Sequence, residues 1–148
     1  MKDPEARAIR QTSAGWLIQR LSTRFEAAMT AALEPHGLAL GQMGLLLAVL
    51  ESGGMTQTEL GTIFAMPAWK ISRHLDGLEA AGLIKRQADP ESRRTHRIHA
   101  TDKARALDPQ LRAATREVNA SVLEPLAPQQ RAQLVDLLRQ VVLPVEKF

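Results

Sequence analysis

Apolar residues recur at intervals of three and four along most of the chain, the spacing of one buried face of an α-helix. This spacing predicts helices over residues 5–34, 40–51 and 102–123, followed by a last helix that ends near Pro144. Pro109 lies inside the third pattern. A proline ring removes a helical hydrogen bond, so we expect a kink or an interruption there.

Two shorter helices are predicted between the second and third of these. Thr56 and Glu59 can form a capping box, in which each side chain binds the other residue's backbone N–H, and this opens a helix that reaches Ile63. Pro67 suits the first turn of the next helix, because its missing N–H would have no helical partner. That helix ends at Gly82. Its buried face carries Ile71, Leu75 and Leu78.

The period of the pattern changes after Gly82. Residues 83–86 and 95–100 are short segments compatible with strands, and the polar residues 87–94 lie between them. Asp89-Pro90 is a turn former within that polar stretch. The segment therefore predicts a two-stranded ribbon with a charged tip, with an irregular surface loop as the alternative.

Length and composition narrow the protein class. The chain has 148 residues, so we expect residues 1–148 to form a single domain. It has no cysteine, which excludes disulfides, thiolate zinc sites and cysteine redox switches. No apolar run approaches the roughly 20 residues of a membrane span, and the charged first residues do not form a secretory signal. We expect a cytoplasmic protein without a cofactor or a membrane partner.

Charge is unevenly distributed along the chain. Residues 67–105 contain nine cationic and five acidic side chains, a net charge of +4, whereas the whole chain has a net charge of +3. A locally basic segment in a near-neutral protein is typical of a nucleic-acid binder. A solvated basic face without a partner is the alternative.

The order of the elements indicates a winged helix-turn-helix. We expect a mainly α fold in which a capped short helix, a second helix and a two-stranded β wing are flanked by N- and C-terminal helices. Such a module places its second helix in the major groove of double-stranded DNA, and its wing reaches the adjacent minor groove. The residues expected to contact DNA are Ala68, Trp69, Lys70, Ser72 and Arg73 on the second helix, Lys85 and Arg86 on the first strand, and Arg93 and Arg94 at the wing tip.

These cations are expected to divide their roles. Side chains of the second helix read base edges or orient the helix, and Lys85 and Arg86 contact phosphates irrespective of sequence. One of Arg93 and Arg94 enters the minor groove, and the other pairs with Asp89 to hold the ribbon.

Several motifs resemble the MarR family of transcriptional regulators. They are Thr56-Gln57-Thr58-Glu59-Leu60, Leu78-Glu79-Ala80-Ala81-Gly82-Leu83-Ile84, Asp89-Pro90-Glu91-Ser92-Arg93-Arg94 and Thr101-Asp102-Lys103. The resemblance covers nearly the whole chain. It implies a homodimer whose terminal helices, residues 5–34 and 102–146, intertwine, while residues 38–100 form the winged DNA-binding lobe. It also implies a ligand-responsive repressor that binds a palindromic operator and is released by a small, often aromatic, acid.

The chain departs from the family pattern at a few positions. Trp69 replaces a small hydroxyl residue; it could stack on a sugar or touch a thymine methyl, but we favour a side chain that folds back as a partly buried anchor. Gly77 stands where a basic residue is common, which weakens the helix and removes a phosphate contact. Ala100 and Ala104 replace the usual Leu and Gly around Thr101.

The terminal helices carry the expected dimer and ligand sites. Their apolar side chains exceed what the winged lobe can cover, and two-fold pairing would bury them. These side chains are Trp16, Leu21 and Phe25 in the first helix and Leu134, Leu138, Val141 and Val145 in the last. By the family resemblance, a ligand would lie against Trp16, Arg20 and Leu47, with Arg20 as the carboxylate partner. The competing interpretation, which we favour, makes Trp16 a core residue and Arg20 a surface cation.

No motif supports an enzyme, because Gly53-Gly54 leads into the capping box and not into a phosphate-binding sequence.

Two alternatives to a ligand-responsive DNA-binding regulator remain. One is a metal-responsive regulator, for which Glu34 and His36 are a candidate pair, whereas His96 and His99 face opposite sides of a strand. The other is a winged-helix module that binds protein without reading DNA.

Overall fold

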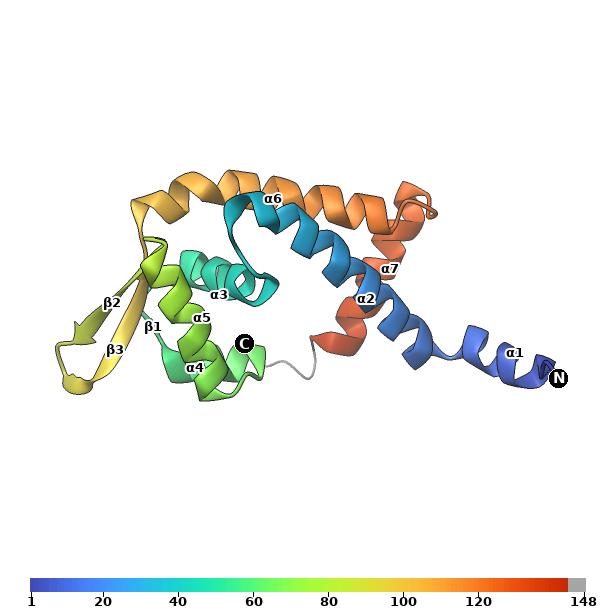
Figure 1. Cartoon of the computed structure of the whole chain (residues 1–148), viewed down its shortest axis with the longest axis horizontal. Coiled ribbons are helices and arrows are strands. Elements are labelled where there is room, and N and C mark those ends of the chain that lie inside the picture. The colour runs from blue at the N-terminus through green and yellow to red at the C-terminus, as the bar shows by residue number, and fades with distance from the viewer. Residues whose placement is uncertain (144–148) are drawn as a thin grey trace.

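The computed structural model describes residues 1–143, which form seven α-helices and three short strands (Figure 1). The helices are α1 (Pro4–Thr12), α2 (Ala14–Leu33), α3 (Leu40–Glu51), α4 (Gln57–Phe64), α5 (Ala68–Ala80), α6 (Asp102–Val122) and α7 (Pro128–Val142). The strands are β1 (Met55–Thr56), β2 (Ile84–Asp89) and β3 (Ser92–Ala100), and a 3-10 turn, η1, spans Glu34–His36. The mainly α architecture agrees with the sequence pattern.

The first predicted helix, over residues 5–34, is two helices in the structure. Ser13 adopts an extended backbone conformation between α1 and α2, and its side-chain oxygen accepts a hydrogen bond from the Trp16 N–H. A serine in this position competes well with a continuous helix, because its hydroxyl satisfies an N–H at the start of the new one. The helical spacing of apolar residues continues across Ser13, so the pattern did not predict the break.

The helix-turn-helix forms as the capping pattern predicts. At the start of α4, the Glu59 carboxylate accepts from the Thr56 N–H at 2.8 Å, and the Thr56 hydroxyl accepts from the Glu59 N–H at 3.2 Å. Ala65 ends α4 in the left-handed region, with φ of 48°, and α5 follows directly after Pro67. Gly82, with φ of 74°, turns the chain out of α5 and into β2.

The wing contains the two predicted strands and a third, short one. The two predicted strands are longer than expected, because residues 87–89 and 92–94 of the polar stretch belong to them. β3 lies in the middle of an antiparallel sheet of order β1-β3-β2, in which Met55 is paired with Ile98 and Ile84 with Ala100. Two residues of β1 are too few to carry a period of two, so the sequence pattern could not reveal it. The outer strands bring the start of α4 and the end of α5 to the same small sheet.

Helix α6 is continuous from Asp102 to Val122, with Pro109 inside it, so the predicted interruption is wrong. Ala104 and Leu111 are buried on either side of Pro109, where α6 packs along α2. This packing compensates for the one hydrogen bond that the proline removes. In Figure 1, α6 runs from the wing at one end to the corner with α7 at the other.

The core is concentrated in the winged lobe. Its fully buried side chains come from α3, α4, α5 and the sheet, together with one face each of α2 and α6. Helices α1 and α7 bury no residue. At the α6–α7 corner, the Arg131 guanidinium donates to the carbonyls of Leu123 and Leu126. The expected dimerisation segment 102–146 includes residues 144–146, and Val145 among them, that lie outside the described part of the chain.

No single helix of the described residues is long and apolar enough to cross a membrane. Residues 14–36 and 40–51 are bent by 73° relative to each other. Only when taken together do they have the length and composition of a membrane span.

Candidate nucleic-acid interface

Helix α5 divides into a buried face and an exposed face. Ile71, Leu75 and Leu78 lie at i, i+4 and i+7 and are fully buried. Trp69, Lys70 and Arg73 are exposed away from that face, Ala68 is exposed at the first position of the helix, and Ser72 is half-buried. The first two turns of α5 therefore present to solvent every residue that the sequence nominated for base readout except Ser72.

Trp69 does not fold back onto the protein. Its side chain is 67% exposed, so the expectation of a partly buried anchor is wrong. The core of the lobe is already filled by aliphatic side chains beneath α5, and the start of the helix directs position 69 outward. Trp69 is the one exposed large apolar residue between positions 19 and 134 of the described chain. An indole in that position can contact a sugar or a thymine methyl group.

Arg86 is tied to α5. Its guanidinium lies 2.8 Å from the Asp76 carboxylate and 3.4 Å from that of Glu79, and it donates to the Ser72 carbonyl. Its backbone N–H also donates to Glu79. These contacts join the wing to α5, a role that the basic character of residue 86 alone did not reveal.

Asp89 is held by Arg97. The Arg97 guanidinium donates to the Asp89 carboxylate at 3.1 Å and to the Gly54 carbonyl at 2.8 Å, so it connects β3 with both the wing turn and the loop before β1. The expected pairing of Asp89 with Arg93 or Arg94 is therefore wrong. The Glu91 N–H and the Arg97 charge hold the pKa of Asp89 below its usual value of 3.8. Arg97 lies three to four residues after those arginines, and the sequence alone does not distinguish the three as partners for Asp89.

Lys85, Arg93 and Arg94 are exposed. Within residues 1–143, none of them takes part in an ion pair. Arg93 and Arg94 are consecutive in β3, so their side chains leave opposite faces of the wing. One of the two can thus be aimed into a groove while the other faces away from it.

His74 adds a titratable group beside these cations. It follows Arg73 on α5 and is half-buried. Burial, and then the charges of Lys70 and Arg73, lower the pKa of His74 below its usual value of 6.5. The imidazole is therefore neutral near pH 7, and the formal charge of this face comes from the lysine and the arginines.

The three residues nominated for a ligand do not share one described cavity. Two guanidinium groups lie over the Trp16 ring, that of Arg20 at 5.6 Å and that of Arg10 at 5.9 Å from its centroid. Leu47 lines a separate groove between α3 and α4, with a volume of about 1110 Å³, whose lining includes neither Trp16 nor Arg20. The charged side chains of that groove are Glu51 and Glu59. The Trp16 cluster is thus cationic, whereas the charged side chains that line the Leu47 groove are acidic.

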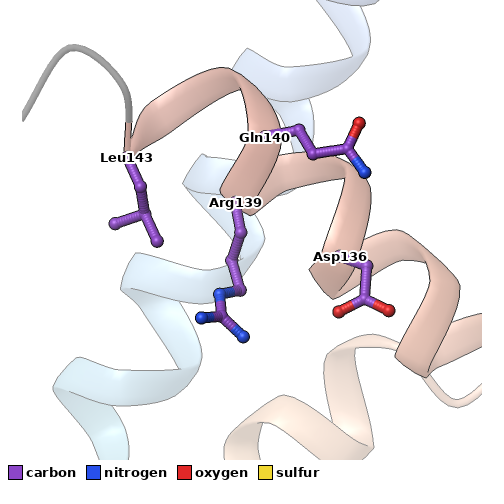
Figure 2. A pocket seen from close by; sticks show the side chains of 4 residues that line it. All are labelled: Asp136, Arg139, Gln140 and Leu143. Carbon is purple, nitrogen blue, oxygen red and sulfur yellow. The ribbon is translucent and has the colours of Figure 1, made fainter.

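A second hollow lies on α7. Figure 2 shows its lining side chains Asp136, Arg139, Gln140 and Leu143 along one face of that helix. The first three come from α7, Leu143 directly follows it, and all four are exposed, so the hollow is an open surface and not an enclosed ligand site. Within residues 1–143, no group of three or more His, Asp or Glu side chains is arranged to hold a metal ion.

Comparison with known proteins identifies this arrangement. The model of the MarR family matches residues 36–95, which contain α3, α4, α5 and most of the wing. The HTH-type transcriptional repressor Rv2887 of Mycobacterium tuberculosis is 33% identical over 118 residues, which cover 79% of this chain and 85% of that protein. The chain belongs to the MarR family.

Solved structures of other regulators superpose on this MarR-family chain over most of its length. A probable transcriptional regulator from Pseudomonas aeruginosa is 30% identical and covers 89% of this chain and 98% of its own, with a TM-score of 0.81. BpsR of Bordetella bronchiseptica, whose DNA binding is regulated by 6-hydroxynicotinic acid, is 23% identical and covers 88% and 93%, with a TM-score of 0.78. The protein is thus a winged helix-turn-helix transcriptional regulator and not an enzyme.

Proposed function

We propose that this MarR-family protein is a repressor that binds a palindromic DNA operator as a homodimer and releases it on binding a small organic acid. The observation that carries the DNA-binding part is the exposed first half of α5, where Trp69, Lys70 and Arg73 project beside a wing that ends in Arg93 and Arg94. Exposed cations on a helix and on the ribbon that follows it are suited to adjacent grooves of a duplex. The repressor named above supports the direction of regulation.

The proposed DNA-binding residues differ in the part of the duplex or of the protein that they contact. Ala68, Trp69, Lys70, Ser72 and Arg73 form the readout surface of α5. Lys85 contacts phosphate, and one of the two wing-tip arginines enters the minor groove. Arg86 contributes through its ion pairs with Asp76 and Glu79, which orient α5 relative to the wing.

The homodimer is supported by the apolar surface of the terminal helices. Val141 is 72% exposed, and neither α7 nor α1 buries any side chain within the described chain. Pairing of two such surfaces removes this apolar area from water, which contributes about 25 cal/mol per Å² buried before the entropy cost of association is subtracted. A two-fold axis would also place two copies of α5 about 34 Å apart, one turn of DNA.

An acidic effector fits the Trp16 cluster better than the Leu47 groove. The guanidinium groups of Arg10 and Arg20 lie over the indole ring, and a guanidinium can bind a carboxylate through two parallel hydrogen bonds. The groove offers only carboxylates as charged groups, which would repel an acid. The effector named for BpsR is itself an aromatic acid and supports this chemical class.

The DNA proposal is tested with duplexes that the parent protein selects from a random-sequence pool. Arg73→Ala and Arg93→Ala are each expected to weaken binding to the selected duplex by about 1–3 kcal/mol in gel-shift titrations. Arg116→Ala is the matched control, because Arg116 is an exposed arginine in the second half of α6 and its removal changes the net charge equally. Failure of the parent to select any duplex, or parent-like binding by both variants, would overturn the proposal.

The effector is tested separately with 6-hydroxynicotinic acid and benzoic acid as probes. Each is added to the parent and to Arg20→Ala, and both DNA release and the thermal unfolding midpoint are recorded. Release and a raised midpoint in the parent, both reduced in Arg20→Ala, are the expected results. If neither acid acts on the parent, the acid effector is wrong while the DNA proposal stands.

A further inference from the structure

One glycine on α3 and one on α5 lie at the place where these two helices pack together, and each faces the other helix. Gly41 is the second residue of α3, and Gly77 lies in the second half of α5. A Cβ atom placed on Gly41 would lie 2.7 Å from Nε2 of His74, and one placed on Gly77 would lie 2.5 Å from Nε2 of Gln42. Both distances are shorter than a carbon and a nitrogen can tolerate, so a methyl group at either position requires movement. The atoms that must move are the ends of side chains, and the cost therefore depends on what holds those side chains in place.

The two contacts are reciprocal. Gln42 follows Gly41 in α3 and covers Gly77, whereas His74 lies one turn before Gly77 in α5 and covers Gly41. His74 and Gly77 are three apart and share a face of α5. Each helix thus offers the other one polar side chain and one bare backbone position. We call these four residues the glycine notch.

Gln42 has a fixed position in the glycine notch. Its Oε1 accepts from the Ala39 N–H at 2.9 Å, the hydrogen bond that caps the start of α3. The amide nitrogen of the same side chain is the atom that approaches Gly77. A Cβ on Gly77 would therefore displace either the cap of α3 or the whole of α5.

We propose that Gly77 is a positioning residue for DNA recognition: it lets α5 seat against the capped end of α3 and so sets the position of the readout surface. The missing side chain is then a requirement of packing and not a lost phosphate contact. This inference rests on the proposed DNA binding. A readout helix displaced by less than 1 Å loses the hydrogen-bond geometry of its base contacts, although the fold tolerates the shift.

The test is a double-variant cycle on Gly77 and Gln42 in the full chain, with the duplex selected by the parent and an unrelated duplex of equal length as probes. Gly77→Ala is expected to bind the selected duplex at least fivefold more weakly. Its affinity for the unrelated duplex should stay within twofold of the parent. Gly77→Ala combined with Gln42→Ala should recover most of the loss, because the amide that collides with the new methyl is gone. Gly15→Ala is the matched control, since a Cβ there meets only the Ser13 hydroxyl at 4.0 Å.

Chemical denaturation of the same variants gives a reading that does not depend on DNA. Gln42→Ala should cost the parent its α3 cap, and it should cost the Gly77→Ala variant much less, because in that variant it also removes the collision with the new methyl group. Parent-like DNA binding by Gly77→Ala, no recovery in the double variant, or additive effects on stability would each overturn the inference. If the parent itself selects no duplex, the proposed function fails. The stability cycle still decides whether the substitutions at Gly77 and Gln42 are energetically coupled.

Discussion

The winged lobe and the terminal helices are built from similar residues but differ in what their apolar faces meet. In the lobe, each apolar face of α3, α4 and α5 is buried against another element of the same chain. In α1 and α7, the apolar side chains face outward, and Leu137 and Val141 are both more than half exposed.

The difference shows which part of the chain carries its own core. A helix with an apolar stripe gains little stability until the stripe is covered. The lobe covers its stripes internally, whereas α7 needs a surface that this chain does not supply in the described part. We therefore expect variants in the lobe to change the stability of the fold, and variants in α7 to change the assembly.

The largest expected effect is on the core of the lobe. Leu75→Ala removes a fully buried side chain from α5 and is expected to lower the free energy of unfolding by about 2–5 kcal/mol, through lost apolar burial and the cavity left behind. Urea denaturation measures it. Val135→Ala in α7, where the side chain is 47% exposed, is the matched truncation and should cost less than about 1 kcal/mol. Equal losses from both would contradict the contrast between lobe and helix.

The second prediction concerns assembly. Replacing both Leu137 and Val141 by Glu places two carboxylates on the exposed apolar face of α7, and burial of an unpaired carboxylate is strongly unfavourable. The dimer should weaken at least about a hundredfold, or about 2.7 kcal/mol. Light scattering across a dilution series measures the change, and circular dichroism should show the helices of the lobe retained. Gln133→Glu, an exposed polar position on α7, is the control. A parent that is monomeric at micromolar concentration would refute the proposed interface.

The third prediction tests the connection inside the lobe. Arg86→Ala breaks the ion pairs with Asp76 and Glu79, whose carboxylates are mostly or partly exposed, so the expected loss of stability is about 1 kcal/mol. Lys85→Ala removes a neighbouring exposed charge and should leave the unfolding midpoint unchanged. Differential scanning calorimetry of the two variants separates a structural ion pair from a solvated cation. Equal midpoints would place Arg86 with the solvated charges.

The smallest effect should come from His74. Because burial and two neighbouring cations lower its pKa, the unfolded chain binds the proton more tightly than the folded one. The stability from this group is complete above pH 6.5 and is lost as the pH falls from 6.5 through the lowered folded pKa. Denaturation at pH 7.5 and 5.5 should show a larger acid loss for the parent than for His74→Asn. A loss of equal size in both would assign the acid sensitivity to other groups.

Local patterns in the sequence were sufficient for most elements of the lobe. The capping box at Thr56, Pro67 before α5 and Gly82 after it each act within a few residues, so their structural outcome follows from backbone chemistry alone. The same locality explains the errors. Ser13 breaks a helix whose apolar spacing is uninterrupted, and Pro109 fails to break one because α2 packs along it.

The candidate site was predicted in outline only. Exposed cations in the basic segment were correctly placed on α5 and the wing, but their partners were not. Arg97, and not Arg93 or Arg94, pairs with Asp89, and Arg86 turns toward Asp76 and Glu79. Arginines a few residues apart are chemically identical in a sequence, and only the register of β2 on β3 decides which of them meets a carboxylate.

The sequence by itself determined the order of the elements apart from the α1–α2 break and β1, the absence of cysteine chemistry, and the concentration of positive charge from α5 to the start of α6. These features depend on composition and on neighbours along the chain. Only the tertiary structure decided that Trp69 stays in solvent, that Trp16 and Leu47 lie in different surroundings, and that Gly77 receives the side chain of Gln42. These outcomes depend on how closely elements distant in sequence approach one another, and that distance is set by the packing of the whole core.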